Sequence, residues 1–147
     1  MPDVPDDGSR LARVIAGANA IQARKYPYCW GGGHGPSPGA SSGISYCWGA
    51  DGAQHPHGSD VGIDCSGSTR LLLVLAGYRD PGPIGSGDFG LYPAGPGKHV
   101  SIYHNAEHVF VTVNGRAWTT SVANYRHGPG WAPHTTVGFA VSHPPGL

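Results

Sequence analysis

Cys65 is the residue whose type and position most clearly favour chemistry. It lies in the segment Asp64-Cys-Ser-Gly, directly before an apolar run that predicts a helix. A thiol in the first turn of a helix faces unpaired backbone N–H groups and the positive end of the helix dipole, which favour the thiolate. The same N–H groups could hold an oxyanion formed on an attacked carbonyl. A buried structural cysteine is the alternative interpretation.

A thiol nucleophile needs a base, and the chain contains nine histidines. Most of them fit surface or packing positions in a chain so rich in loops. His55 and His57 offer two nitrogens, which do not complete a metal site, and no Cys/His spacing matches a zinc pattern. We therefore expect no metal and no cofactor. His99 and His108, which open predicted strands, are the candidates for the base.

Two predicted helices precede these strands. Residues 9–25 place apolar side chains at intervals of three, four and seven, typical of a helix with one buried stripe, and Ser9 suits its N-cap. Residues 64–77 predict the second helix, with Asp64 as its N-cap and Gly77 as its C-terminal stop. Cys65 is therefore expected in the first turn of this helix.

From His99 onward the hydrophobic period changes to two. Short segments rich in β-branched and aromatic residues, separated by turn residues, predict four strands: His99–Tyr103, His108–Val113, Arg116–Ser121 and Val137–Ser142. Asn114-Gly115, between the second and the third, predicts a hairpin turn. Helices followed by antiparallel strands make the expected fold class α+β.

Length and composition indicate one domain, residues 1–147, without a membrane span. The chain has 9 Lys+Arg and 9 Asp+Glu, so no basic excess favours nucleic-acid binding. No apolar run approaches the roughly 20 residues that cross a bilayer, and the acidic N-terminus does not resemble an export signal. The 25 glycines and 14 prolines concentrate in two expected loops, 31–62 and 78–98.

The two remaining cysteines lie in an echoed motif. Tyr28-Cys-Trp-Gly recurs as Tyr46-Cys-Trp-Gly, so Cys29 and Cys47 could pair and leave Cys65 free. The disulfide would close a loop of about 18 residues and stabilise the fold by roughly 3 kcal/mol. The hypothesis requires that their Cβ atoms approach.

Tyr28-Cys-Trp-Gly-Gly, then Asp64-Cys-Ser-Gly, then a histidine opening a strand, resembles the NlpC/P60 family of papain-like cysteine peptidases. These features recur in order over residues 11–142, and the stretch 95–113 looks like an actinobacterial or phage-associated branch. The resemblance implies a papain-like fold, with N-terminal helices packed on a small antiparallel sheet. Residues 31–62 would be an insertion beside the cleft.

The resemblance also implies a base and an orienting residue. In isolation, His99-Val-Ser-Ile-Tyr looks like the family's His-Val-Gly-Ile-Tyr, but the segment ending in His99 fills the place of the preceding strand. We therefore assign His108 as the base. Eleven or twelve positions later stand Thr119 and Thr120, where the family carries His, Asn, Gln or Asp. A threonine stabilises imidazolium less than a carboxylate does, so a backbone carbonyl or another residue is the alternative orienter.

The remaining site residues follow the family positions. By resemblance the Tyr28 hydroxyl assists the oxyanion, and Trp30, Asp64 and Ser66 line the substrate site. Each has a structural alternative, which is loop packing for Tyr28 and Trp30, helix capping for Asp64 and satisfaction of the helix start for Ser66.

The expected function is that of a cysteine endopeptidase or amidase acting on peptidoglycan stem peptides. By resemblance it would cut the γ-D-glutamyl–diamino-acid bond through a thioester intermediate. The alternatives are a catalytically weak or silent wall-binding module, and an acyltransferase or amidase on another substrate. Peptidoglycan places the protein outside the cytoplasm, at a cell wall or in a phage virion.

Overall fold

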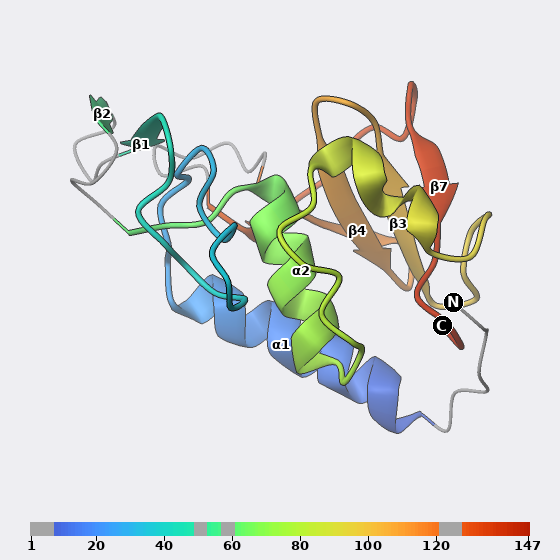
Figure 1. Cartoon of the computed structure of the whole chain (residues 1–147). Coiled ribbons are helices and arrows are strands. Elements are labelled where there is room, and N and C mark those ends of the chain that lie inside the picture. The colour runs from blue at the N-terminus through green and yellow to red at the C-terminus, as the bar shows by residue number, and fades with distance from the viewer. Residues whose placement is uncertain (1–7, 49–52, 57–60, 121–127) are drawn as a thin grey trace.

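The computed structural model describes residues 8–48, 53–56, 61–120 and 128–147. Two α-helices and one 3-10 helix occur within them: α1 (Ser9–Ala23), α2 (Cys65–Leu75) and η1 (Ser86–Leu91). The strands are β1 (Tyr46–Trp48), β2 (Gln54–Pro56), β3 (Val100–His104), β4 (Val109–Val113), β5 (Arg116–Thr119), β6 (Gly130–Trp131) and β7 (Ala140–Ser142). The expected α+β class is confirmed (Figure 1).

The larger sheet is antiparallel and five-stranded, with the strand order β6-β5-β4-β3-β7. Asn114 and Gly115 join β4 to β5 with φ angles of 50° and 81°, the positive values that a two-residue hairpin turn requires. This turn sets the register in which Val111 lies opposite Trp118. The predicted hairpin is therefore confirmed.

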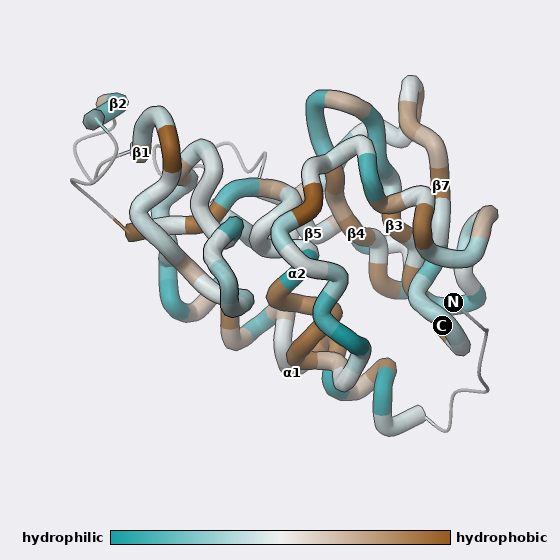
Figure 2. Tube along the Cα trace, viewed as in Figure 1, coloured by the Kyte–Doolittle hydropathy of each residue, from teal (hydrophilic) through white to brown (hydrophobic). Residues whose placement is uncertain are grey.

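Helix α2 packs against α1 on one side and against β4 on the other (Figure 1). The buried core between these elements includes Val14, Leu72, Val111 and Trp118, each about 1% exposed. Figure 2 shows the corresponding hydrophobic segments where α1 and α2 meet and along β3 and β4. The start of α2 is thereby held against the sheet. No helix in the described ranges is long and apolar enough to span a membrane.

The boundaries of the first helix differ from the prediction. Gly8, with a φ of 89°, is the N-cap of α1, so Ser9 lies inside the helix and is not its N-cap. The helix ends two residues early, at Ala23, because Lys25 takes a φ of 54° that does not continue a helix. The cap of α2 is as predicted: the Asp64 side chain accepts a hydrogen bond from the Gly67 N–H at 2.7 Å.

The two segments expected as loops contain regular structure. Within 78–98 the structure has η1, which buries Phe89 completely, so the loop prediction is wrong there. Within 31–62 it has the pair β1–β2. Both elements are too short to show a hydrophobic period. Ser121, the predicted end of the third strand, lies outside the described residues.

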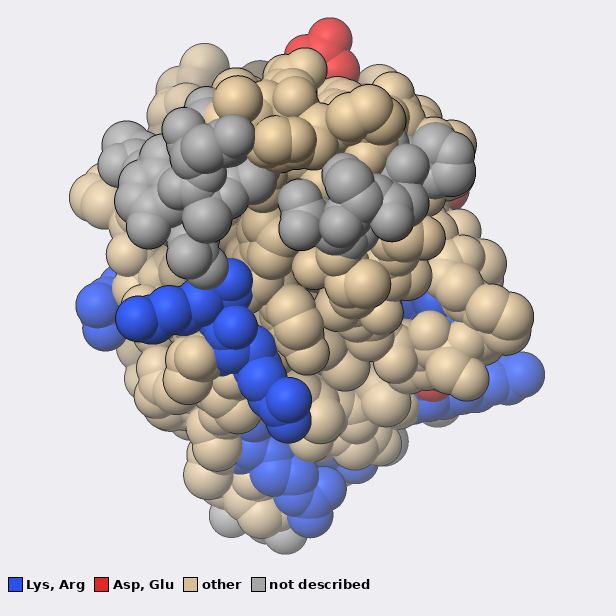
Figure 3. All heavy atoms as spheres, turned by 90° about the vertical axis from the view of Figure 1, so that its left-hand side faces the viewer, with Lys and Arg blue, Asp and Glu red and all other residues tan. Residues whose placement is uncertain are grey.

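Charged side chains are unevenly distributed despite the zero net charge. On the face drawn in Figure 3, Lys and Arg gather in the lower half, and few acidic side chains are visible. One arginine is instead buried: Arg70 on α2 is 1% exposed. Its Nε and Nη2 donate to the Asp80 carboxylate at 2.7 and 2.9 Å, and its Nη1 donates to the carbonyls of Gly33 and Gly35 at 3.0 and 2.8 Å. Arg70 thus ties the glycine-rich segment to α2.

We expect Arg70→Leu to lower the free energy of unfolding by about 3 kcal/mol, because it removes the charged partner of Asp80 and the donor to three backbone carbonyls, those of Gly33, Gly35 and Pro36. Urea denaturation followed by circular dichroism measures the change. The control is Arg24→Leu at the exposed end of α1, which should change stability by less than about 0.5 kcal/mol. Equal effects of the two substitutions would contradict the role of Arg70.

Candidate active site

Cys65 is the first residue of α2, and its side chain is buried, with the residue 6% exposed. Backbone N–H groups of Ser66 and Val109 interact with the sulfur and favour its negative form. Burial outweighs them and, together with the Asp64 charge, raises the pKa of the thiol to about 11. The expectation that the helix start favours a thiolate is therefore corrected. The contact with Val109 brings the sulfur to the residue that follows His108.

His108 lies directly before β4 and is half-buried. Its Nε2 is 3.0 Å from the Thr119 Oγ1. His134 stacks on the imidazole at 5.1 Å between ring centroids, and Phe110 stacks at 6.0 Å. Burial, with a smaller contribution from the His134 charge, lowers the pKa of His108 to about 4. His108 is therefore uncharged at neutral pH.

His99, the alternative base, lies at the opposite end of the sheet. Its Nδ1 is 3.2 Å from the Asn114 Oδ1, beside the β4–β5 turn. Val109, which contacts the Cys65 sulfur, pairs instead with His104 at the far end of the β3–β4 ladder. The structure thus brings His108, and not His99, to the end of β4 where the thiol lies.

Thr119 and Thr120 are both buried, at 2% and 4% exposure. The structure brings Thr119, the last residue of β5, to the imidazole of His108. A hydroxyl oxygen can accept a hydrogen bond from an Nε2–H, which would leave Nδ1 as the unprotonated nitrogen of the ring. Thr119 is thus the threonine placed to orient His108.

An open cleft of about 690 Å³ lies in front of Cys65. Trp30, Asp64 and Ser66, the residues predicted to contact substrate, line it together with Tyr28. Ala106, Glu107 and residues 85–88 also line it. Among the described residues, the lining reaches these neighbours of His108 without including His108 itself.

Tyr28 lies near Cys65 and Asp64. Burial raises the pKa of its phenol above the usual range, and the charges of Cys65, Asp64 and Tyr46 add to this effect. The hydroxyl therefore stays protonated and can donate a hydrogen bond. Trp30, 48% exposed, presents an apolar surface to the cleft.

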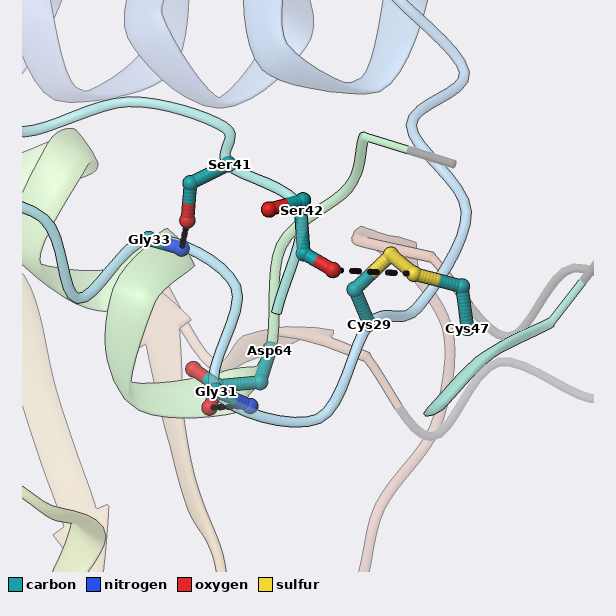
Figure 4. The surroundings of a disulfide bond; sticks show 7 residues. All are labelled: Cys29, Gly31, Gly33, Ser41, Ser42, Cys47 and Asp64. Carbon is teal, nitrogen blue, oxygen red and sulfur yellow. Dashed lines mark hydrogen bonds between the residues drawn. A yellow bond between two sulfur atoms is a disulfide. The ribbon is translucent and has the colours of Figure 1, made fainter. Parts of the chain in front are cut away.

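Cys29 and Cys47 are joined in a disulfide, which leaves Cys65 as the free cysteine (Figure 4). Cys29 lies between Tyr28 and Trp30 in the sequence, so the disulfide anchors the segment that carries both of these cleft residues. The same segment is tied to the start of α2, since the Gly31 N–H donates to Asp64 Oδ2 at 3.0 Å (Figure 4).

His34 is a cleft residue that sequence reasoning did not identify. Its Nε2 lies 3.0 Å from Asp64 Oδ1 and 2.9 Å from Ser66 Oγ. The hydrogen bond with Asp64 is the main cause that raises the pKa of His34. A single histidine in a glycine-rich stretch carries no periodic signal, and its partners are 30 and 32 residues away.

No family model, no curated protein and no solved structure matches this chain. Within the part of the chain that the structure describes, no group of three or more His, Cys, Asp or Glu side chains could hold a metal ion. The chemistry of the site is therefore inferred from its own residues.

We expect His134→Ala to raise the pKa of His108 from about 4 toward its ordinary value of 6.5. The substitution removes the neighbouring charge and exposes the imidazole to water, and both changes favour the protonated ring. Titration of the histidine ring protons by NMR measures the shift. The control His99→Ala should leave the His108 titration unchanged, and an unshifted His108 in His134→Ala would contradict the packing described.

Proposed function

We propose that this protein is a papain-like cysteine peptidase of the NlpC/P60 type that hydrolyses an amide bond in the peptide stem of peptidoglycan. The observation that carries the proposal is the meeting of the α2 start with β4. There the Cys65 sulfur contacts the backbone of Val109, next to an imidazole held by Thr119. An open cleft in front of the thiol gives a peptide access to it.

The proposed reaction starts from an uncharged thiol and an uncharged imidazole. His108 takes the proton of Cys65 while the sulfur attacks the amide carbonyl. The Cys65 backbone N–H and the Tyr28 hydroxyl hold the oxyanion. His108 then gives its proton to the nitrogen of the breaking C–N bond, and the amine leaves. Water then loses a proton to His108 and attacks the thioester. The C–S bond breaks, the carboxylic acid is released, and His108 returns the proton to the sulfur.

Burial determines when charge separates in this mechanism. In the resting protein burial disfavours both thiolate and imidazolium, so the ion pair forms as the substrate is attacked. The Thr119 hydroxyl orients the ring but carries no charge to stabilise imidazolium. We therefore expect a slower enzyme than one with a carboxylate in this place.

The substrate class follows from the family resemblance and fits the cleft. The apolar side chains of Trp30 and Ile44, 48% and 64% exposed, offer one wall for the stem. The bond proposed is the one between γ-D-glutamate and the diamino acid. Such a substrate implies action outside the cytoplasm, at a cell wall or from a phage virion.

A catalytically silent wall-binding module is the second candidate. The neutral orienting residue Thr119 and the raised pKa of Cys65 favour it. Release of peptide fragments from purified peptidoglycan separates the two candidates, because a binding module releases none. Mass spectrometry of the products also distinguishes hydrolysis from acyl transfer, since transfer adds an acceptor to the acyl fragment.

We expect Cys65→Ala to abolish release of stem fragments, because no other atom of the site replaces the nucleophile. His108→Ala should lower kcat/KM by about a thousandfold, the usual contribution of a general base. Liquid chromatography of the released fragments measures both. Unchanged release by a folded Cys65→Ala protein would contradict the assignment.

We expect Thr119→Val to lower kcat/KM by about fivefold, the equivalent of losing one hydrogen bond worth about 1 kcal/mol. Thr120→Val is the matched control, since it makes the same change at an equally buried neighbour and should alter kcat/KM less than about twofold. The same peptide assay measures both variants. A larger loss in Thr120→Val would transfer the orienting role to that residue.

A further inference from the structure

The Asp64 carboxylate lies in the cleft next to the proposed nucleophile and already makes four contacts. Oδ1 accepts from the Gly67 N–H at 2.7 Å and the Ser66 hydroxyl at 3.2 Å, and lies 3.0 Å from His34 Nε2. Oδ2 accepts from the Gly31 N–H at 3.0 Å. A carboxylate has about four lone-pair sites. Oδ1 is thus fully used and Oδ2 in part, so a substrate ammonium could bind Oδ1 only by displacing one of its donors.

His34 is the displaceable donor that resembles an ammonium in charge. Its Nε2 faces Asp64 and Ser66, and the backbone carbonyl of Pro83 accepts from the ring as well. Acceptors around the ring favour the doubly protonated imidazolium. The charged side chains that act on it are Asp64, which caps α2 and favours the cation, and Arg70 on α2, which opposes it.

The backbone around His34 is held firmly in place. The buried Arg70 guanidinium binds the carbonyls of Gly33 and Gly35, the residues on either side of His34. The Gly33 N–H donates to the Ser41 hydroxyl at 2.9 Å (Figure 4). The backbone is therefore fixed both before and after His34, and this holds the His34 side chain next to Asp64.

We propose that His34 is a specificity-determining residue that occupies the place of a substrate ammonium on Asp64, so that the cleft selects stem peptides with an acylated amino end over those with a free one. The inference rests on the proposed function. In the proposed bond the amino end lies only two residues from the attacked carbonyl, within about 10 Å along the chain. A free ammonium that binds Oδ1 must break the His34–Asp64 pair, and at either oxygen it approaches the His34 ring, whose cationic form Asp64 favours. An acylated end does neither.

Binding in the Cys65→Ala background tests this without catalysis. The probes are a stem tetrapeptide with a free amino end and the same peptide N-acetylated, each titrated by calorimetry. We expect the acetylated peptide to bind at least tenfold more tightly. Adding His34→Ala exposes the Asp64 carboxylate and should reverse the preference, while adding His99→Ala, the same change at the far end of the sheet, should leave it intact.

A second variant guards against loss of fold in His34→Ala. His34→Gln keeps an N–H donor for Asp64 without the charge, and we expect its preference to fall between those of the other two proteins. Equal binding of the two peptides, both with His34 present and after His34→Ala, would overturn the inference. If the peptide with a free amino end binds more tightly with His34 present, and the wild-type protein still hydrolyses stem peptides, the inference is wrong but the proposed function stands. If neither peptide binds, it fails together with the proposed substrate.

Discussion

The carboxylate of Asp64 at the start of α2 is the interaction on which the rest of the site depends. It caps the helix through Gly67, holds the glycine-rich segment through Gly31 and pairs with His34. The residue that follows it is Cys65, so the same contacts that define the first turn of α2 also set the position of the thiol. The contacts that hold the glycine-rich segment therefore also fix the position of the Cys65 thiol.

Packing of α2 against β4 supplies the second half of the site. It brings the sulfur to Val109 while the β4–β5 hairpin brings Thr119 to His108. The same packing buries the thiol and the imidazole, which shifts both pKa values toward the uncharged forms. In the proposed mechanism, attack by the sulfur and proton transfer to the imidazole are therefore coupled, because the resting protein favours neither charged form.

Local chemistry explains which features sequence reasoning could anticipate. The Asp64 cap and the Asn114-Gly115 turn depend on neighbours within a few residues, and each was predictable from residue types alone. Three features depend on contacts between distant segments, which no periodic sequence pattern can predict. They are the short helix η1, the burial of Arg70 and the contact between His34 and Asp64. The raised pKa of Cys65 was missed for the same reason, because burial is a property of the packed chain.

The central claim is that Cys65 carries the acyl group of a cleaved stem peptide. Mass spectrometry of the intact protein, acid-quenched during turnover of a stem tetrapeptide and then mapped by proteolysis, tests it most directly. We expect a mass increase equal to the γ-glutamyl fragment, located on Cys65 and absent from Cys65→Ala. Cleavage of the peptide with no adduct on Cys65, or the same adduct on Cys65→Ala, would contradict the claim.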